Sequence, residues 1–289
     1  MNPAEPASVL IEALPYLQRF RGATFVIKYG GSAMEDPALV DGVLRDIVFL
    51  EAVGINPVIV HGGGKAITRA MKEAGLAARF VDGLRVSDAA SIALIDRTLA
   101  AEISPGIAAG IERFGGHAHV LPGKEVLRAE KLDYRLAATG EPVDLGFVGE
   151  VTAVAAAPIA ELVAREIVPV ISPLATGADG AVYNINADLA AAEVAKALGA
   201  RKLIYLTDVN GVLRDPADPA STISSLNPAE VAELKKIGVL SGGMLPKVDS
   251  ALDALDHGVG QVHFLDGRVP HALLLEIFTD DGTGTQFKK

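Results

Sequence analysis

A lysine is followed almost at once by two glycines in the stretch Lys28-Tyr29-Gly30-Gly31. The apolar residues 25–27 before it predict a buried strand, and the glycines predict a tight turn at the carboxyl end of that strand. Ligands of open parallel sheets lie just outside the carboxyl ends of the strands, and glycines let backbone N–H groups approach an anion closely. Lys28 would then be a cation beside a phosphate-sized cradle, although an ordinary buried strand whose last residue reaches solvent fits the same stretch.

The same pattern recurs where the apolar strand Asn56–His61 runs into Gly62-Gly63-Gly64-Lys65 and a predicted helix over 66–74. Neither unit is a GxGxxG dinucleotide fingerprint, and neither is a GxxxxGK[ST] P-loop, because an alanine follows Lys65. Two strand–glycine–helix units in one chain are far less expected by chance than one. We interpret their glycines as residues that approach a small anionic substrate or a transferring phosphate.

Further polar residues could contribute to such a site. Arg85 lies in a predicted loop, where it could form a bidentate pair with a carboxylate or be a plain surface arginine. Asn184 and Asn186 alternate with the residue between them, which predicts that both amides point to one face. Asp188, near a predicted helix start, either converges with these amides or simply caps the helix.

Composition limits the class of protein. The 289 residues suffice for one large α/β domain or two modest ones, and half of them are hydrophobic while only 5% are aromatic, which favours helices packed on both faces of a sheet. The net charge of −10 argues against nucleic acid or an anionic membrane surface as a partner. The absence of cysteine excludes disulfides and thiolate sites, and the six histidines form no HExxH pattern, so we predict no protein-bound metal.

No targeting or membrane-spanning segment is evident in the sequence. The N-terminus lacks a basic region followed by a long apolar segment, which a secretory signal would need. No run of about 18 apolar residues occurs either. We therefore expect a soluble, cytoplasmic protein.

Strand and helix patterns alternate along the chain, which predicts a mostly parallel sheet. Residues 123–154 interrupt this alternation with a short, charged pattern that predicts a small surface hairpin, an element that often covers a site. The expected helices cover 37–53, 91–114 with a bend at Pro105-Gly106, and 189–198. The expected strands cover 119–121, 168–172, 202–212, 261–265 and 274–278.

A predicted helix over residues 6–20 precedes the first strand. It places Leu10, Leu14 and Leu17 on one apolar stripe, and Pro15 should kink or split it. Such a helix has no obvious place inside a compact sheet. The stripe either packs back on its own chain or contacts a second subunit.

Five motifs occur in one order along the chain: Lys28-Tyr29-Gly30-Gly31, His61-Gly62-Gly63-Gly64, Gly83-Leu84-Arg85-Val86, Asn184-Ile185-Asn186-Ala187-Asp188 and Gly242-Gly243-Met244-Leu245-Pro246-Lys247. Together they resemble the amino acid kinase family, in particular its members that act on N-acetyl-L-glutamate, in register from about Leu10 to Thr285. The resemblance implies one α/β domain, a three-layer αβα sandwich with a mostly parallel central sheet. It also implies an N-terminal interlacing helix over 1–22, an acetylglutamate-binding lobe over 23–178, and a lobe over 179–289 that binds ATP and arginine.

The implied activity is ATP-dependent phosphorylation of the side-chain carboxylate of N-acetyl-L-glutamate in arginine biosynthesis. By the resemblance, Lys28 and Lys247 stabilise the transferring γ-phosphoryl group, Asp188 orients both lysines, and Mg²⁺ arrives with ATP. The other implied site residues bind substrate (Gly63, Gly64, Arg85, Asn184 and Asn186), phosphate (Gly30, Gly31 and Gly62) and nucleotide (Thr207, Asp208 and Gly243).

The residue types suit this chemistry. A substrate carboxylate with a pKa of ~4.3 is already ionised at neutral pH, so the reaction needs no general base. Cations and backbone donors must instead offset the repulsion between a carboxylate and a polyphosphate. Another acceptor, such as aspartate, glutamate, carbamate or a nucleoside monophosphate, stays open. An arginine sensor without catalysis and a nucleotide-binding scaffold without phosphoryl transfer also stay open, although Lys28, Asp188 and Lys247 argue against both.

The N-terminal helix resembles that of family members that arginine inhibits and that interlace such helices into hexamers, as trimers of dimers. The segment 271–279 also resembles an arginine-site signature. The resemblance implies feedback inhibition by L-arginine and leaves open the binding of a nitrogen-signalling protein. The implied arginine-binding residues are Tyr16, Lys202, His271, Glu276 and Gly284.

Overall fold

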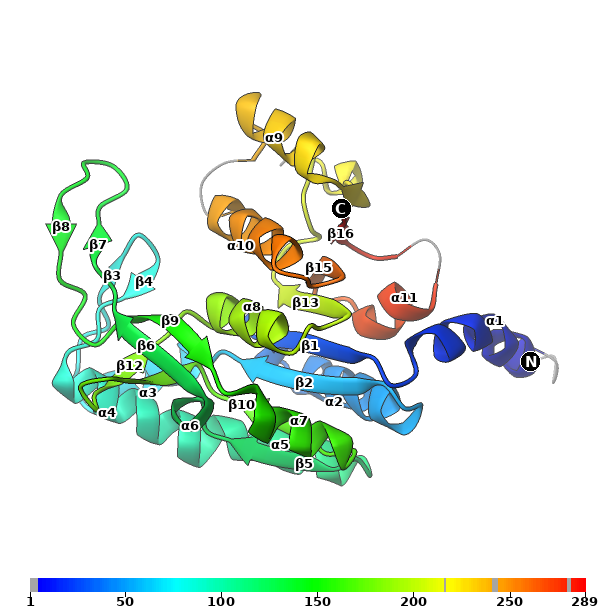
Figure 1. Ribbon diagram of the computed structural model, residues 1–289, viewed down its shortest axis with the longest axis horizontal. Coiled ribbons are helices and arrows are strands. Elements are labelled where there is room, and N and C mark those ends of the chain that lie inside the picture. The colour runs from blue at the N-terminus through cyan, green and yellow to red at the C-terminus, as the bar shows by residue number, and fades with distance from the viewer. Residues whose placement is uncertain (1–4, 216, 241–243, 280–281) are drawn as a thin grey trace.

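The structure is a computed structural model that describes residues 5–215, 217–240, 244–279 and 282–289. Within these residues one eight-stranded sheet runs through the molecule (Figure 1). In spatial order its strands are β14 (Ser225–Leu226), β16 (Thr285–Phe287), β15 (Gln261–Asp266), β13 (Lys202–Thr207), β1 (Thr24–Tyr29), β2 (Asn56–His61), β10 (Val168–Ile171) and β5 (Ala118–Leu121).

The sheet is mostly parallel, as the sequence predicts. Among its described strands, the pairing of β15 with β16 is the one antiparallel contact. Strand β1 lies between β13 and β2 in the middle of the sheet. The carboxyl ends of these three strands, two of which run into predicted glycine turns, therefore meet at one edge.

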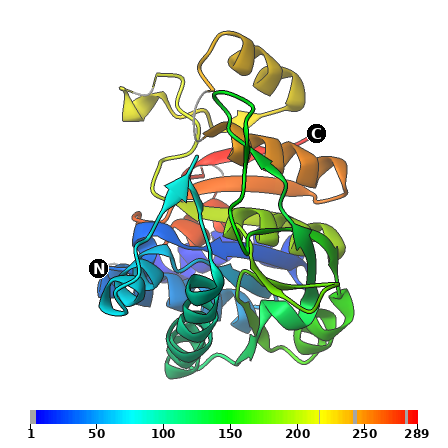
Figure 2. The ribbon, with the colours of Figure 1, turned by 90° about the vertical axis from the view of Figure 1, so that its left-hand side faces the viewer.

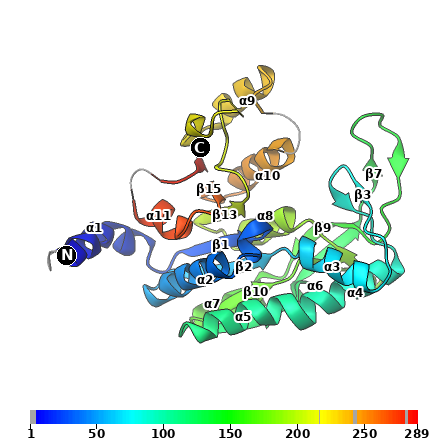
Figure 3. The same cartoon turned by 180° about the vertical axis from the view of Figure 1, so that it is seen from behind.

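Helices form the two outer layers, so the predicted αβα sandwich is confirmed; Figure 3 shows the face opposite to that of Figure 1. Each face has its own hydrophobic cluster. One cluster includes α2 (Pro37–Ala52), α3 (Gly64–Glu73), α5 (Ser104–Arg113) and α11 (Ala272–Phe278), and the other includes α7 (Ala156–Ala164), α8 (Ala187–Ala197), α9 (Pro228–Lys236) and α10 (Met244–Asp256).

Strand β1 contributes to both clusters. Phe25 and Ile27 are fully buried against the layer that contains α2, whereas Val26 is buried against the layer that contains α8 and α10. Successive side chains of a strand point to opposite faces. Lys28 therefore lies on the same face as Val26, beneath α8 and α10.

A smaller sheet and two hairpins project from the edge that carries the glycine turns (Figure 2). The hairpin predicted over 123–154 is confirmed. It begins with α6 (Gly123–Val126), and β6 (Leu127–Lys131) pairs antiparallel with β9 (Gly149–Val154). The smaller sheet has the order β12 (Val182–Asn184), β11 (Leu174–Gly177), β6 (Leu127–Lys131) and β9 (Gly149–Val154), and the hairpins are β3 (Phe80–Val81) with β4 (Leu84–Arg85) and β7 (Tyr134–Arg135) with β8 (Pro142–Val143).

The prediction of a closing strand over 274–278 is wrong. These residues belong to helix α11, and the sheet closes with β16 instead. Leu273 and Ile277 are buried four residues apart, whereas Leu275 between them is 38% exposed. That spacing buries one face of a helix, and a run of apolar residues this short does not distinguish a buried strand from a helix by composition alone.

The helix predicted over 91–114 is interrupted earlier than expected. It comprises α4 (Ala89–Thr98), a π-helical segment (Leu99–Ile103) and then α5. The irregular segment thus precedes the predicted bend at Pro105-Gly106. The ring of a proline clashes with the carbonyl group four residues earlier, so Pro105 disturbs the helix on its N-terminal side.

Helix α1 (Glu5–Phe20) is one continuous helix, so Pro15 does not split it. Tyr16 packs edge-to-face on Phe278 of α11, with ring centroids 6.5 Å apart. Leu10 and Leu14 are 64% and 44% exposed, so the apolar stripe is only partly covered by its own chain. Across the described residues, no helix is both long enough and apolar enough to cross a membrane.

Helices α2 and α11 meet at a buried carboxylate. Asp46 of α2 is 1% exposed, and its Oδ1 lies 2.6 Å from Nδ1 of His271, the residue that precedes α11. Its other oxygen has no hydrogen-bond partner among the described residues. Burial raises the pKa of Asp46 to about 6, although His271 opposes this shift.

The contribution of Asp46 to the stability of the protein should therefore fall as the pH rises through 6. A carboxyl group whose pKa is raised on folding contributes stability below that pKa and loses it above. Between pH 5 and pH 7.5 this group should remove about 1 kcal/mol from the free energy of unfolding, and D46N should lack that loss. Urea denaturation at both pH values tests this, with the exposed Asp256→Asn as the control; equal pH dependence in wild type and D46N would contradict it.

Candidate active site

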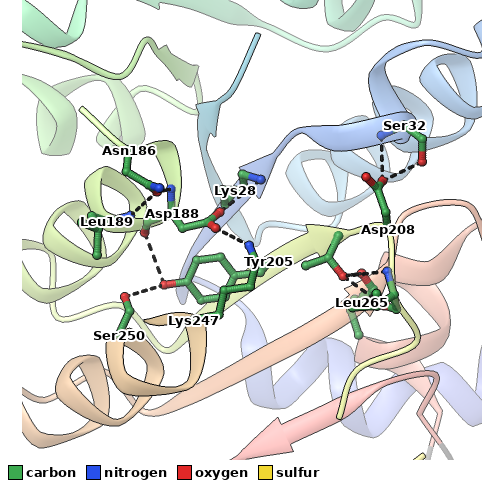
Figure 4. A network of polar contacts seen from close by, with 12 residues as sticks. Lys28, Ser32, Asn186, Asp188, Leu189, Tyr205, Asp208, Lys247, Ser250 and Leu265 are labelled. Carbon is green, nitrogen blue, oxygen red and sulfur yellow. Dashed lines mark hydrogen bonds and ion pairs between the residues drawn. The ribbon is translucent and has the colours of Figure 1, made fainter. Parts of the chain in front are cut away.

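Two lysines from distant parts of the chain share one carboxylate at the carboxyl edge of the sheet (Figure 4). Lys28 lies in β1, Asp188 lies in the first turn of α8, and Lys247 lies in the first turn of α10. Lys28 Nζ lies 3.1 Å from Asp188 Oδ1, and the Lys247 ammonium donates a hydrogen bond to Asp188 Oδ2. The side chains are 12%, 15% and 29% exposed in that order, so both ion pairs are largely shielded from bulk water.

Asp188 carries its charge at this buried position because both lysines stabilise it. Burial by itself would raise the pKa of Asp188, but the charges of Lys28 and Lys247 outweigh burial and hold the pKa below its usual value. The N-terminal end of α8 also favours a carboxylate in its first turn. A cation in the first turn of α10 is disfavoured by that helix's own dipole, so Lys247 depends on Asp188 for compensation.

Tyr205 of β13 contacts both α8 and α10 through its hydroxyl group. Its ring is buried beside Lys28, its register partner on β1. Its hydroxyl lies 3.2 Å from Ser250 Oγ of α10 and donates a hydrogen bond of 3.4 Å to the backbone oxygen of Asp188 (Figure 4). Tyr205 and Ser250 were not predicted from the sequence, because each alone is an ordinary core residue.

The first glycine turn borders the Lys28 ammonium. A Cβ atom added to Gly30 would lie 2.8 Å from Lys28 Nζ. Gly30 has extended backbone geometry that any residue adopts, so glycine is required there for space and not for conformation. The second turn lies alongside: a Cβ on Gly62 would lie 3.8 Å from Gly30 Cα, and Gly62 N donates a hydrogen bond of 2.7 Å to the oxygen of Tyr29.

Asp208 fixes the end of the first turn. Ser32 donates two hydrogen bonds to Asp208 Oδ1, from its backbone nitrogen at 2.8 Å and its hydroxyl at 2.6 Å. Gly31 has a φ of +71°, and a Cβ there would lie 2.5 Å from the same oxygen, so this position needs glycine for both conformation and space. Burial opposes ionisation of Asp208, but the Ser32 hydrogen bonds and the nearby Lys28 charge hold its pKa low.

The second turn is held from behind by His61. Burial lowers the pKa of His61 to about 4, so the ring is neutral at pH 7. Its Nδ1 lies 2.8 Å from the Gly62 oxygen and its Nε2 lies 2.7 Å from Ser104 Oγ. Because a carbonyl oxygen only accepts, Nδ1 donates to Gly62 and Nε2 accepts from Ser104. A Cβ on Gly63 would lie 2.5 Å from Ile103 Cδ1, which explains the glycine at that position.

A cavity of about 810 Å³ opens in front of both turns. It is lined by four of the residues predicted to contact substrate or phosphate, Gly31 of the first turn together with Gly63, Gly64 and Arg85. Its apolar wall comes from α2, α5 and the β3–β4 hairpin, and its charged rim comes from Glu35, Lys65, Arg69 and Glu102. The cavity therefore suits a small molecule with both apolar and anionic parts.

Arg85 is the buried cation of this cavity. It is 8% exposed, and its Nη2 donates hydrogen bonds to the Gly64 oxygen at 3.0 Å and to Thr68 Oγ1 at 2.9 Å. The guanidinium also stacks over the ring of Phe80 at 4.6 Å, and burial lowers its pKa. The sequence left a plain surface arginine open as an alternative, and the structure contradicts that alternative.

The remaining predicted residues are placed less directly. Asn184 ends β12 and is not among the residues that line the cavity. Asn186 lies beyond the strand, and its side chain caps α8, which is the role the sequence left open for Asp188. Thr207 Oγ1 donates hydrogen bonds to the backbone oxygens of Val209, in the loop after β13, and of Leu265 in β15. Gly243 lies outside the described residues.

A comparison with protein-family models matches residues 23–266 to the amino acid kinase family. The chain belongs to the amino acid kinase family. It is 51% identical over 283 residues to an acetylglutamate kinase of Akkermansia muciniphila, which covers 98% of this chain and 95% of that protein. It is also 50% identical over 294 residues to an acetylglutamate kinase of Pelotomaculum thermopropionicum, with 100% and 99% covered.

Solved structures of this fold include an N-acetylglutamate synthase from Neisseria gonorrhoeae in complex with coenzyme A and N-acetyl-glutamate. It is 26% identical to this chain with a TM-score of 0.84, and the match covers 98% of this chain and 63% of the synthase. The same synthase in complex with coenzyme A and L-arginine has a TM-score of 0.80. The family's core is thus shared with a second enzyme that binds acetylglutamate.

A second polar cluster lies at the other end of β13, behind the active site. Lys202 Nζ lies 3.0 Å from His263 Nε2, and His263 Nδ1 lies 2.7 Å from Glu276 Oε1. All three side chains are buried: Lys202 is 4% exposed, and the His263 and Glu276 side chains are 1% and 7% exposed. The sequence predicted Lys202 and Glu276 for this region but missed His263, whose signal is a lone histidine inside an apolar strand.

Burial lowers the pKa of both basic groups of this cluster, that of Lys202 to about 8 and that of His263 to about 4. Burial alone would raise the pKa of Glu276, but the hydrogen bond from His263 lowers it. Of the other predicted arginine-binding residues, His271 lies in the separate pair with Asp46. A Cβ atom added to Gly284 would lie 2.0 Å from the Phe264 oxygen, so this position is tightly packed.

Replacing Gly30 by alanine should slow the enzyme without unfolding it. The new Cβ displaces the flexible end of Lys28 and not backbone, so we expect kcat to fall by about tenfold to a hundredfold, within the range for loss of one preorganised donor. Steady-state kinetics and thermal unfolding of G30A measure both effects. The control is Gly42→Ala, where the added Cβ meets nothing within 4 Å; a G30A variant with wild-type kcat would contradict the role of Lys28.

Proposed function

We propose that this protein uses ATP to phosphorylate the side-chain carboxylate of N-acetyl-L-glutamate, a step of arginine biosynthesis. The observation that carries the proposal is the carboxylate of Asp188 held between Lys28 and Lys247 beside two glycine turns. The identity of about half of the residues with acetylglutamate kinases over the whole chain supports the choice of acceptor. Residues 23–178 would hold the acceptor and 179–289 the nucleotide.

The reaction requires that two anions come together. The substrate carboxylate is ionised at neutral pH and attacks the γ-phosphorus, and ADP leaves. Lys28 and Lys247 stabilise the negative charge on the phosphoryl oxygens in flight, while Asp188 keeps both ammonium groups charged and aimed. Backbone N–H groups of the turns at Gly31, Gly63 and Gly64 donate to the same oxygens or to the substrate, and Mg²⁺ bound to the nucleotide supplies further positive charge.

The cavity in front of the turns would hold the acceptor. Arg85 is its buried cation, and the guanidinium has a donor geometry that matches a carboxylate. Phe80 offers an apolar surface for the acetyl or methylene groups, and Asn184 and Asn186 remain proposed contacts for the amide portion. Thr207, Asp208 and Gly243 remain proposed neighbours of the nucleotide.

The proposal is tested by ADP release from MgATP in the presence of N-acetyl-L-glutamate, glutamate, aspartate or UMP. We expect rapid turnover only with the acetylated acceptor, because an acceptor that leaves polar groups of the site unpaired is rejected strongly. K28M serves as the control and should lose turnover. Equal turnover with free glutamate, or none with any acceptor, would contradict the proposed substrate.

We propose further that L-arginine inhibits the enzyme at the Lys202–His263–Glu276 cluster. Helices α1 and α11 cover this region, with Tyr16 on Phe278 between them. Glu276 offers a carboxylate for the guanidinium or the α-ammonium group, and a solved relative binds L-arginine. The exposed Leu10, Ile11 and Leu14 of α1 support a hexamer in which these helices pair between dimers. The binding of a nitrogen-signalling protein stays open.

Replacing Glu276 by glutamine should relieve inhibition while catalysis persists. Loss of one charged partner should weaken arginine inhibition by about tenfold or more, whereas kcat at zero arginine should change little because the cluster is remote from Asp188. Dose–response curves for arginine measure this, and the exposed Glu233→Gln is the matched control. Unaltered inhibition in E276Q, or no inhibition of wild type, would contradict the proposed site.

A further inference from the structure

The β3–β4 hairpin carries two residues of the acceptor cavity on neighbouring strands. Phe80 and Arg85 are register partners across the hairpin, and the Arg85 guanidinium stacks on the Phe80 ring. The strands are joined by Asp82 and Gly83, both with positive φ, as in the tight two-residue turns that suit the twist of a hairpin. The position of this short hairpin therefore sets how Phe80 and Arg85 face the cavity.

A second hairpin lies against the first. Figures 1 and 3 show β7 and β8 rising beside β3 and β4 above the cavity edge of the sheet. Their bases are joined by backbone hydrogen bonds: Ser87 N donates to the Leu145 oxygen at 2.9 Å, and Phe147 N donates to the Ser87 oxygen at 2.6 Å. These hydrogen bonds hold the base of the β3–β4 hairpin and do not involve the residues at its tip.

The tips are joined by one carboxylate. Asp82 Oδ2 accepts a hydrogen bond of 2.8 Å from the Tyr134 hydroxyl and another of 3.0 Å from Ala137 N. Both donors belong to the β7–β8 hairpin or its turn. These two hydrogen bonds hold the pKa of Asp82 low, so the carboxylate stays a full acceptor at neutral pH.

We propose that Asp82 is a positioning residue that fastens the β3–β4 hairpin to Tyr134 and Ala137 and so holds Phe80 and Arg85 over bound acetylglutamate. Asp82 touches neither substrate nor the reacting atoms. Without the contact at the tip, the hairpin remains attached at Ser87 but its tip is free to swing, and the acceptor loses its cover. This inference rests on the proposed function, because it takes the 810 Å³ cavity as the acceptor site.

The test compares Asp82→Ala, Tyr134→Phe and the double variant with wild type. The chain supplies a control of the same chemistry, because Asp179 accepts hydrogen bonds from the Tyr183 hydroxyl at 2.8 Å and from Ala181 N at 3.0 Å, within a single hairpin of the smaller sheet. Tyr183→Phe removes that equivalent bond without touching the link between the two hairpins. Each variant is measured for KM of acetylglutamate, KM of ATP, kcat and hydrogen exchange over residues 80–87.

We expect D82A and Y134F each to raise the KM of acetylglutamate by about threefold to tenfold, the effect of losing one or two hydrogen bonds to a charged group. The KM of ATP and kcat should stay within about twofold. Because both substitutions break the same contact, the double variant should be no worse than D82A. Exchange over 80–87 should accelerate in all three variants and stay at the wild-type rate in Y183F.

Several results would overturn the inference. Equal losses for ATP and acetylglutamate, fully additive single variants, or the same defect in Y183F would indicate general destabilisation. Faster exchange with an unchanged KM would show a contact that does not act on the acceptor. Arg85→Lys separates this failure from that of the proposed function: if R85K raises the KM of acetylglutamate while D82A does not, the cavity stands and the role of Asp82 falls, whereas no effect of R85K would contradict the cavity itself.

Discussion

A carboxylate withdrawn from water needs compensating positive charge, and Asp188 obtains it from two lysines that come from opposite parts of the chain. Lys247 depends on this carboxylate in particular, since a cation in the first turn of a helix is disfavoured by the helix dipole. The sheet must therefore bring β1, α8 and α10 to one point. Tyr205 contributes to this arrangement, because its buried hydroxyl contacts both α8 and α10 from the strand beside Lys28.

The glycine turns follow from the same constraint. The Lys28 ammonium, which we propose to approach a phosphoryl group, leaves no room for a side chain on Gly30, and the neighbouring turn at Gly62 packs against Gly30. Asp208 and His61 then fix the two turns from opposite sides with neutral or fully paired polar groups. The two turns thus lie at one edge of the sheet, with the proposed acceptor cavity in front of it and the Lys202–His263–Glu276 cluster behind it.

Much of the fold and most of the central site could be predicted from the sequence. The mostly parallel sheet, both glycine turns and the hairpin over 123–154 follow from local patterns, and Lys28, Asp188 and Lys247 follow from motifs. The predictions that were wrong or incomplete concern residues whose structure depends on tertiary contacts. The apolar run of α11 fits a strand as well as a helix until its neighbours are known. The loop predicted around Arg85 is instead a hairpin, in which Asp82 and Gly83 form a typical two-residue turn and Arg85 lies on β4. His263 became visible only when folding placed Lys202 and Glu276 on either side of it.

We propose that Asp188 serves the chemical step by holding two lysines and not by binding substrate. Single-turnover transfer from ATP to acetylglutamate, followed by rapid quench in wild type and Asp188→Asn at saturating substrates, tests it most directly. We expect the rate of transfer to fall by about a hundredfold or more, as for loss of a preorganised electrostatic group, while the dissociation constants of ATP and acetylglutamate stay close to those of wild type. An unchanged transfer rate, or a loss confined to substrate binding, would show that Asp188 does not serve the chemical step in this way.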